Sequence, residues 1–308
     1  MTARHSLRSI QTTGATIGEG PAWDVAGNRL LWCDIPGGTV HETLAGEDGW
    51  RAGRSWEMGG PVGAVMPAAA GGFIAAVGHR IVHVDADGEH RVVCTAGFDP
   101  QQLRFNDGKC DPAGRFWVGT QSHDGSAGKG AALYCLDVDG RLHERLGGVT
   151  ISNGLDWSPD GRFFYYIDTP TLGIDRFDFD VERGLLANRH SLITHRKGEG
   201  RPDGMAVDAE GGLWVAFFYA GVVRHYAPDG RLIEEIATGV PQTTSCAFGG
   251  PAGTTLFVTT ARARVPEWRA LDAGFPLSII EEALNAAHAG DLLAFEPGVS
   301  GPPAQPWG

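Results

Sequence analysis

The sequence has 308 residues, of which 42% are hydrophobic and 20% charged, and this composition is typical of a globular protein with a large core. The formal net charge of −12 argues against a nucleic-acid partner, because contacts with phosphates need clustered Lys and Arg side chains. The pattern of a secretory leader is missing, as is any apolar run of about 18 residues, so we expect a cytoplasmic protein without a membrane partner.

One pattern recurs along the chain: a turn that contains glycine, then a hydrophobic strand, then a second alternating segment. The repeats begin at Asp24, Ala68, Asp111, Ser158, Asp208 and Gly250. Their spacing is close to the period of roughly 40–50 residues that is typical of propeller blades with four strands each. Six repeats therefore predict an all-β fold, a six-bladed β-propeller, as a single domain over residues 1–308 with its core at about 10–300.

Two segments lie outside the repeats. The N-terminal "SLRSIQTT" is predicted to add a strand to the last blade, because a propeller must close and an open sheet edge invites unwanted pairing. Residues 265–290 predict a short helix inserted within the sixth blade. Ser278 and Glu281 there form a capping-box pattern, and Gly290 is expected to end the helix.

Aromatic and cysteine positions predict packing rather than chemistry. The large aromatic side chains of the repeats are expected to pack between neighbouring blades. These residues are Trp32, Trp117, Phe164, Trp214 and Phe257. The five cysteines are scattered without a C-x-x-C pair, which argues against a thiolate zinc site and favours buried free thiols.

Oxygen-bearing side chains recur five residues before the repeat starts. The positions in this register are Glu19, Gly63, Asn106, Asn153, Asp203 and Ser245. Because one register of each blade lies at one height around the propeller axis, we expect the side chains of Glu19, Asn106, Asn153 and Asp203 to converge. For each residue taken alone, the alternative is a turn cap.

Such a group of donors predicts a central metal site. Two carboxylates with one or two amide oxygens suit Ca²⁺, Mg²⁺ or Mn²⁺ and also accept Zn²⁺ or Fe²⁺. A cation would also neutralise two carboxylates that are costly to bury together. The expected cofactor is therefore one divalent metal ion of unassigned identity.

Five longer motifs resemble the SMP-30/gluconolactonase/regucalcin-like family. They are "IGEGPAWD", "RFNDGKCDPAGRFWVGT", "ISNGLDWSPDG", "RPDGMAVDAEGGLWVA" and "LFVTTAR". The resemblance implies a six-bladed propeller that acts as a metal-dependent sugar lactonase. It implies metal ligands at Glu19, Asn153 and Asp203, substrate contacts at Arg104 and Asn106, and Asp203 as the general base.

The sequence departs from the family pattern after "GT". Many relatives carry a substrate-binding Glu in the loop that here reads "QSHDGSAGKG" over residues 121–130, so His123 or Asp124 is expected to replace it. The loop is rich in Gly and Ser, as in a mobile lid. The roles of two further residues are undecided from the sequence. His195 is a candidate for the lining of the cavity mouth, and Asp168 is either a group that supports the site from behind or a strand-end cap.

The expected activity is hydrolysis of an aldonolactone to its aldonic acid in carbohydrate catabolism, with a small-molecule sugar lactone as partner and a monomer or weak homodimer as the state in solution. One alternative is a related propeller enzyme that hydrolyses aryl esters or phosphotriesters. Another is a calcium-binding regulator or scaffold without catalytic activity. No Gly-x-Ser-x-Gly motif occurs, which argues against a serine hydrolase.

Overall fold

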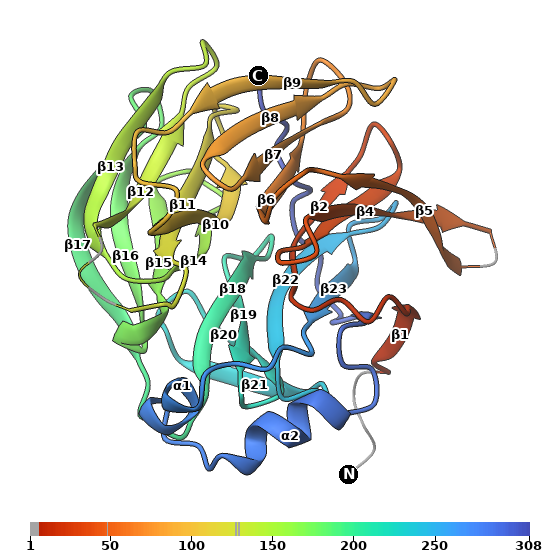
Figure 1. Ribbon diagram of the computed structural model, residues 1–308, viewed down its shortest axis with the longest axis vertical. Helices are drawn as coiled ribbons and strands as arrows, with labels where there is room; N and C mark the ends of the chain where they lie inside the picture. Colours follow the sequence, from red (N-terminus) through yellow and green to blue (C-terminus); the bar gives the residue numbers. More distant parts are fainter. Residues whose placement is uncertain (1–5, 48, 127, 129) are drawn as a thin grey trace.

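Six blades surround a central axis (Figure 1). The computed structural model describes residues 6–47, 49–126, 128 and 130–308, and in this part of the chain the strands form six antiparallel sheets of four strands. The innermost strands of neighbouring blades contact one another in a closed ring. The predicted all-β, six-bladed propeller is therefore confirmed.

Each of the first five blades takes its strands from consecutive sequence. Blade one contains β2 (Gly18–Asp24), β3 (Arg29–Asp34), β4 (Thr39–Gly46) and β5 (Gly49–Glu57); blade two contains β6 (Val62–Pro67), β7 (Phe73–Val77), β8 (Arg80–Val84) and β9 (His90–Thr95); blade three contains β10 (Leu103–Cys110), β11 (Phe116–Ser122), β12 (Ala131–Leu136) and β13 (Leu142–Val149). Blade four contains β14 (Ser152–Trp157), β15 (Phe163–Asp168), β16 (Gly173–Asp180) and β17 (Leu185–Thr194), with a short 3₁₀ turn, η1 (Thr169–Thr171); blade five contains β18 (Arg201–Val207), β19 (Leu213–Phe218), β20 (Val222–Tyr226) and β21 (Leu232–Ala237).

The sixth blade joins the two ends of the propeller sequence. It contains β22 (Thr243–Gly249), β23 (Thr255–Thr260), β24 (Leu292–Phe295) and β1 (Arg8–Gln11). Strand β1 pairs antiparallel with β24, with Arg8 opposite Ala294. The predicted closing strand is thus confirmed, and it covers the edge that β24 would otherwise expose.

The core lies between the blades, as predicted from the aromatic positions. Trp32, Trp117, Phe164, Trp214 and Phe257 are all fully buried. Each of six hydrophobic clusters in the described residues is built mainly from two neighbouring blades, so every sheet buries both faces against its neighbours.

A buried aspartate ties the repeat's turn to its aromatic residue. The Asp111 carboxylate accepts hydrogen bonds from Trp117 Nε1 at 2.8 Å and from Arg115 Nε at 2.6 Å. In blade five, Asp208 accepts in the same way from Trp214 Nε1 at 2.9 Å. The Asp-x-x-Gly turn therefore also orients the Trp side chain that fills the space between blades.

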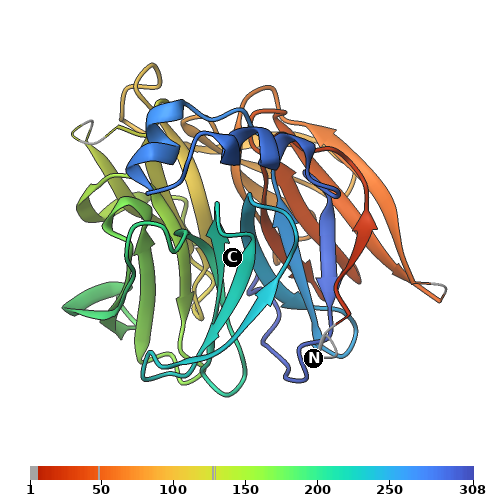
Figure 2. The same ribbon diagram turned by 90° about the horizontal axis from the view of Figure 1, so that it is seen from below.

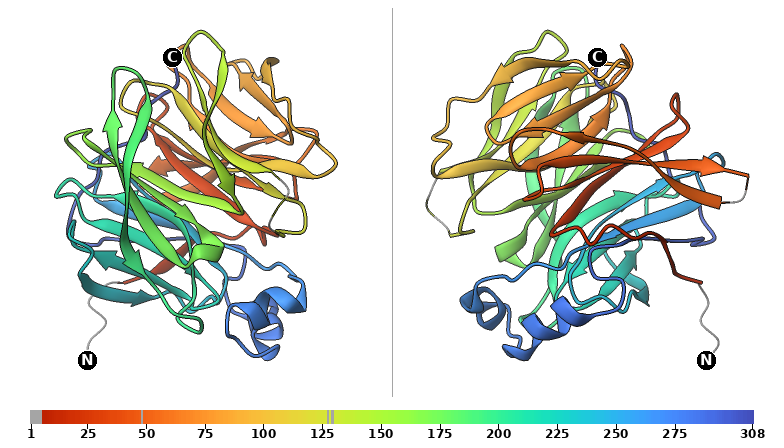
Figure 3. Two further views of the ribbon diagram at one scale, coloured as in Figure 1. Left: turned by 90° about the vertical axis from the view of Figure 1, so that its left-hand side faces the viewer. Right: turned by 45° about the vertical axis from the view of Figure 1, so that its right-hand side comes forward.

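The insertion in the sixth blade forms two helices, not one. Helix α1 spans Glu267–Asp272 and α2 spans Ser278–Asn285, and both lie across one end of the blades (Figures 2 and 3). The predicted capping box is wrong, because the turn already starts at Pro276 and Leu277 and no side chain caps α2. Gly290 does not end the helix either. A Cβ there would lie 2.5 Å from the Ala15 carbonyl oxygen, so this glycine permits a close backbone approach.

All five cysteines are free, and four of them are buried while Cys94 is partly exposed. Among the described residues, no helix is long and apolar enough to cross a membrane.

Candidate metal centre and substrate cavity

The predicted register coincides with an irregularity in every inner strand. Strands β2, β6, β10, β14, β18 and β22 each shift register against their neighbour close to the expected ligand position. Such bulges turn side chains out of the regular alternation. The glycines at these points let the inner strands pack closely: a Cβ at Gly154 would lie 2.5 Å from the Asp203 carbonyl oxygen, and one at Gly204 would lie 2.0 Å from Ser245 Oγ. This close packing is the reason that a glycine follows Asn153.

The predicted side chains meet in one cavity on the axis, at the end of the blades that bears the helices. The cavity has a volume of about 90 Å³. It is lined by Ile17, Glu19, Ile35, Arg104, Asn106, Gln121, Ile151, Asn153, Thr169, Arg201, Asp203, Phe218, Tyr219, Val265 and Arg269. The four residues of the register are nearly buried, with exposed fractions of 4% for Glu19 and 7% for Asp203.

A chain of hydrogen bonds links three blades across this cavity. Arg104 Nη1 donates to Asn106 Oδ1 at 2.8 Å, and Asn106 Nδ2 donates to Asn153 Oδ1 at 2.8 Å. Asn153 Nδ2 then donates to Thr169 Oγ1 at 2.7 Å, and this hydroxyl donates to the Pro202 carbonyl at 2.8 Å, next to Asp203. Both amides are thereby oriented, and Asn153 Oδ1 keeps one lone pair that is not used by the protein.

The two carboxylates of the site repel each other when both are ionised. Burial raises the pKa of Glu19 well above its ordinary value, and the charges of Asp203 and Asp107 raise it further. Burial is also the main cause that raises the pKa of Asp203, and Asp107 adds to it. Asp107 lies beside them on β10, and burial raises its own pKa to about 6. The negative charges of these buried acids thus repel one another, and they favour the approach of a positive charge.

These donors fit a hard cation. No cluster of three or more His, Cys, Asp or Glu side chains suited to a metal occurs in the described residues, so a site here needs an amide as its third protein donor. Glu19 and Asp203 supply two carboxylates, and neither forms an ion pair within the described part of the chain. Asn153 supplies an oriented amide oxygen. An all-oxygen set of this kind suits Ca²⁺, Mg²⁺ or Mn²⁺.

Comparison with known proteins shows the family of the chain. A family model described as "SMP-30/Gluconolactonase/LRE-like region" matches residues 17–262, which is more than half of the chain. The chain belongs to this family. It is 38% identical to regucalcin of Sus scrofa over 255 residues, a match that covers 80% of this chain and 83% of that protein.

Solved structures of this propeller type superpose on the whole chain. A luciferin-regenerating enzyme aligns with a TM-score of 0.86 and 27% identity, and the match covers 98% of this chain and 99% of that one. A gluconolactonase of Xanthomonas campestris aligns with a TM-score of 0.70 and 22% identity over 94% of this chain and 89% of that one, which shows a shared fold.

This SMP-30/gluconolactonase-like chain places His123 and Asp124 outside the residues that line the cavity. Both are exposed: His123 Nε2 contacts the Pro100 carbonyl at 3.0 Å, while Asp124 accepts from Ser122 Oγ at 2.9 Å and holds the start of the loop. The side chain that does line the cavity from this loop is Gln121, the first residue after "GT". The family's Glu therefore has no acidic counterpart among the lining residues of this loop.

His195 and Asp168 also lie outside the cavity lining. The His195 ring packs edge-on against Phe217 at 4.8 Å between centroids, and burial lowers its pKa to about 4. Asp168 accepts hydrogen bonds from the backbone N–H groups of Thr150 and Ile151, at 3.0 and 2.8 Å. Asp168 is therefore a strand-end cap, and it positions the segment that leads into Asn153.

Sequence reasoning missed several residues of the cavity. Gln121, Arg201, Tyr219 and Arg269 line it but stand outside the register of the predicted metal donors. Arg201 shares its place in the repeat with Arg104, since each precedes a repeat start by seven residues. Arg269 comes from α1, and only the packing of the insertion over the axis brings it here. Gln121 is the second-last residue of strand β11, so its position near the strand end was one available signal.

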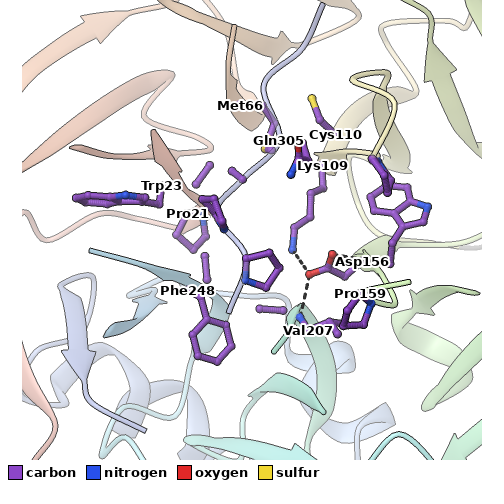
Figure 4. Close-up of a pocket in the computed structure, with 18 of the residues that line it drawn as sticks. Pro21, Trp23, Met66, Lys109, Cys110, Asp156, Pro159, Val207, Phe248 and Gln305 are labelled. Carbon is purple, nitrogen blue, oxygen red and sulfur yellow. Dashed lines mark hydrogen bonds and ion pairs between the residues drawn. The ribbon is translucent and has the colours of Figure 1, made fainter. Parts of the chain in front are cut away.

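A second cavity, of about 160 Å³, lies toward the opposite ends of the inner strands (Figure 4). Lys109 Nζ binds the Asp156 carboxylate there at 2.7 Å, and Val207 N donates to the same oxygen at 2.9 Å. The C-terminal segment crosses this cavity with Pro302 to Gln305 in its wall. None of the residues proposed from sequence for the metal or the substrate lines this second cavity.

Proposed function

We propose that this protein hydrolyses a sugar lactone to the corresponding acid, with one divalent cation held by Glu19, Asn153 and Asp203. The observation that carries the proposal is the pair of buried carboxylates beside an oriented amide, in a cavity that also presents a guanidinium. Family membership supports it, since relatives include proteins named gluconolactonase.

Asp203 is the proposed general base. Its side chain forms no hydrogen bond within the described residues, while burial and the nearby Asp107 raise its pKa. Both features favour proton uptake from a water that attacks the lactone carbonyl. When bound, a divalent cation here supplies a Lewis acid for the carbonyl oxygen and lowers the pKa of a water.

Arg104 is the proposed substrate clamp. Its two hydrogen bonds both leave from Nη1, to Phe105 O and Asn106 Oδ1, each at 2.8 Å. The donors on Nε and Nη2 remain available for ring hydroxyls or the ring oxygen. Asn106 has less freedom, because both hydrogens of its Nδ2 are used by Ser152 O and Asn153 Oδ1. It therefore orients Arg104 and Asn153 and offers substrate only a remaining lone pair of Oδ1.

The proposal is tested by metal add-back. The protein is stripped with EDTA, and each of Ca²⁺, Mg²⁺, Mn²⁺, Zn²⁺ and Fe²⁺ is restored while aldonolactone hydrolysis is followed with a pH indicator. We expect hydrolysis above the spontaneous rate with at least one cation, and its loss in Asp203→Ala with the fold retained. Paraoxon and an aryl ester are assayed in parallel. Hydrolysis of these alone would favour the phosphotriester and ester alternative, and saturable metal binding without any hydrolysis would favour a regulator.

A further inference from the structure

The cavity contains a guanidinium that no acidic side chain neutralises. Arg269 lines the cavity from α1, and its Nε is buried without a hydrogen-bond partner. Within the described ranges this side chain forms no ion pair. Its neighbour Arg201 differs, because Arg201 Nη2 binds the Asp272 carboxylate at 2.6 Å. A buried, unsatisfied cation is costly for a folded protein, and such a cost is typical of a binding site.

The surrounding structure holds Arg269 in place. Helix α1 is anchored by a hydrophobic cluster that includes Tyr219, Ala270 and Ile280. On the other side, Gly125 of the segment after β11 lies against the guanidinium. A Cβ at Gly125 would lie only 1.6 Å from Arg269 Nη2, and the positive φ of 70° there also suits glycine. Arg269 therefore sits between the insertion and the loop, at the mouth of the cavity.

A charge count of the cavity leaves two positive groups. The charges of Glu19 and Asp203 are together balanced by one divalent cation. Arg104 and Arg269 then remain, and they are close enough that the Arg269 charge, after burial, helps to lower the pKa of Arg104 to about 10. Asp203 and Asp124 both act on Arg269 electrostatically and raise its pKa, against the larger lowering by burial. Asp107 is buried nearby but does not line the cavity; even when it is counted as ionised, the loaded site keeps an excess of one positive charge.

We propose that Arg269, together with Arg104, binds an anionic group of the substrate, so that the preferred lactone is one that carries a carboxylate or a phosphate ester. This inference rests on the proposed lactonase function and narrows its substrate class. Two guanidinium groups are suited to this task, because each presents paired donors to two oxygens of one anion. A neutral aldonolactone would leave both cations without an anionic partner.

The test uses lactone pairs that differ in one group. The metal-loaded protein is assayed with glucaro-1,4-lactone against glucono-1,4-lactone, and with 6-phosphoglucono-1,5-lactone against glucono-1,5-lactone. We expect kcat/KM to be at least about tenfold higher for the anionic member of one pair, which also identifies the anion. Arg269→Gln should lower kcat/KM for the anionic lactone about tenfold, while kcat/KM for the neutral lactone should change less than twofold. Arg269→Lys should retain part of the preference.

A matched control and a binding measurement complete the experiment. Arg264→Gln removes an exposed positive charge, paired with Glu281, from the same segment and should leave both lactones unaffected. Calorimetry with glucarate and gluconate, which are not turned over, should show tighter binding of the dianion that is lost in Arg269→Gln. Equal hydrolysis of neutral and anionic lactones, with both reduced alike in Arg269→Gln, would refute the anion site but leave the lactonase intact. If no lactone is hydrolysed with any metal, the proposed lactonase function is refuted. The anion site is then judged from calorimetry alone: tighter binding of glucarate than of gluconate supports it, and equal binding refutes it.

Discussion

Replacing Asp203 by Asn probes the metal centre while the shape of the side chain is preserved. The change removes one of two buried carboxylates, and the charge of this one raises the pKa of the other, Glu19. Asparagine still offers an oxygen but lacks the charge, so we expect divalent metal affinity to fall at least about 100-fold.

The size of the effect on thermal stability follows from linkage. A metal at 100 times its Kd stabilises the folded wild-type protein by about 2.7 kcal/mol. For a chain of 308 residues, an unfolding entropy of about 2.1 cal/mol/K per residue gives about 0.65 kcal/mol per degree. The expected rise in Tm is therefore about 4 °C for the wild type. In Asp203→Asn, a 100-fold weaker Kd leaves about 0.4 kcal/mol, which is less than 1 °C.

Differential scanning calorimetry with and without metal measures both values, and Asp139→Asn serves as a control that removes an exposed turn carboxylate. A pH series in EDTA adds a second readout. Because burial raises the folded-state pKa values of Glu19 and Asp203, the folded protein keeps protons that the unfolded chain loses above about pH 4. This contribution to stability should fall as pH rises, and less steeply in Asp203→Asn. An equal metal-induced Tm shift in wild type and variant would refute the reasoning.

Three further predictions concern other parts of the molecule. Arg104→Met should raise KM for the lactone about 10- to 100-fold with a smaller effect on kcat, as steady-state kinetics will show; an unchanged KM would remove Arg104 from the substrate site. Asp111→Asn leaves the Arg115 charge buried without its partner, so a loss of about 3 kcal/mol and about 5 °C in Tm is expected by calorimetry. Deletion of residues 300–308 removes the backbone hydrogen bonds of Trp307 with Pro67 and Ala69, and it should lower the free energy of unfolding in urea by about 3 kcal/mol, with lactone hydrolysis at 25 °C retained; equal unfolding midpoints would contradict this.

The propeller was predictable because its determinants are local and repeated. A turn that ends in glycine, followed by a hydrophobic strand, recurs in each blade, and three of the six turns read Asp-x-x-Gly. The structure shows what this Asp does in two blades: the Asp111 and Asp208 carboxylates bind both the turn and the Trp. The same periodicity places Glu19, Asn106, Asn153 and Asp203 at one height, and the structure brings all four to one cavity. Metal binding by these residues remains a prediction.

What lies outside the repeat could not be predicted in the same way. The insertion over residues 265–290 forms two helices. The second begins with a turn at Pro276 and Leu277, so its N-cap is Leu277 and not Ser278, as the capping pattern predicted. Arg269 reaches the cavity through packing between residues distant in sequence, which no periodicity reveals. After "GT", Gln121 lines the cavity, while His123 and Asp124 are exposed and do not line it. The chain turns between them, because Gly125 N donates to the Ser122 carbonyl.

Titration of the stripped protein with metal, followed by lactone hydrolysis at each step, tests the central claim most directly. The account predicts that activity rises linearly and stops at one equivalent of metal per chain, and that Asp203→Asn shows no such rise. Lactone hydrolysis that is independent of added metal, or metal binding at one equivalent without any hydrolysis, would contradict it.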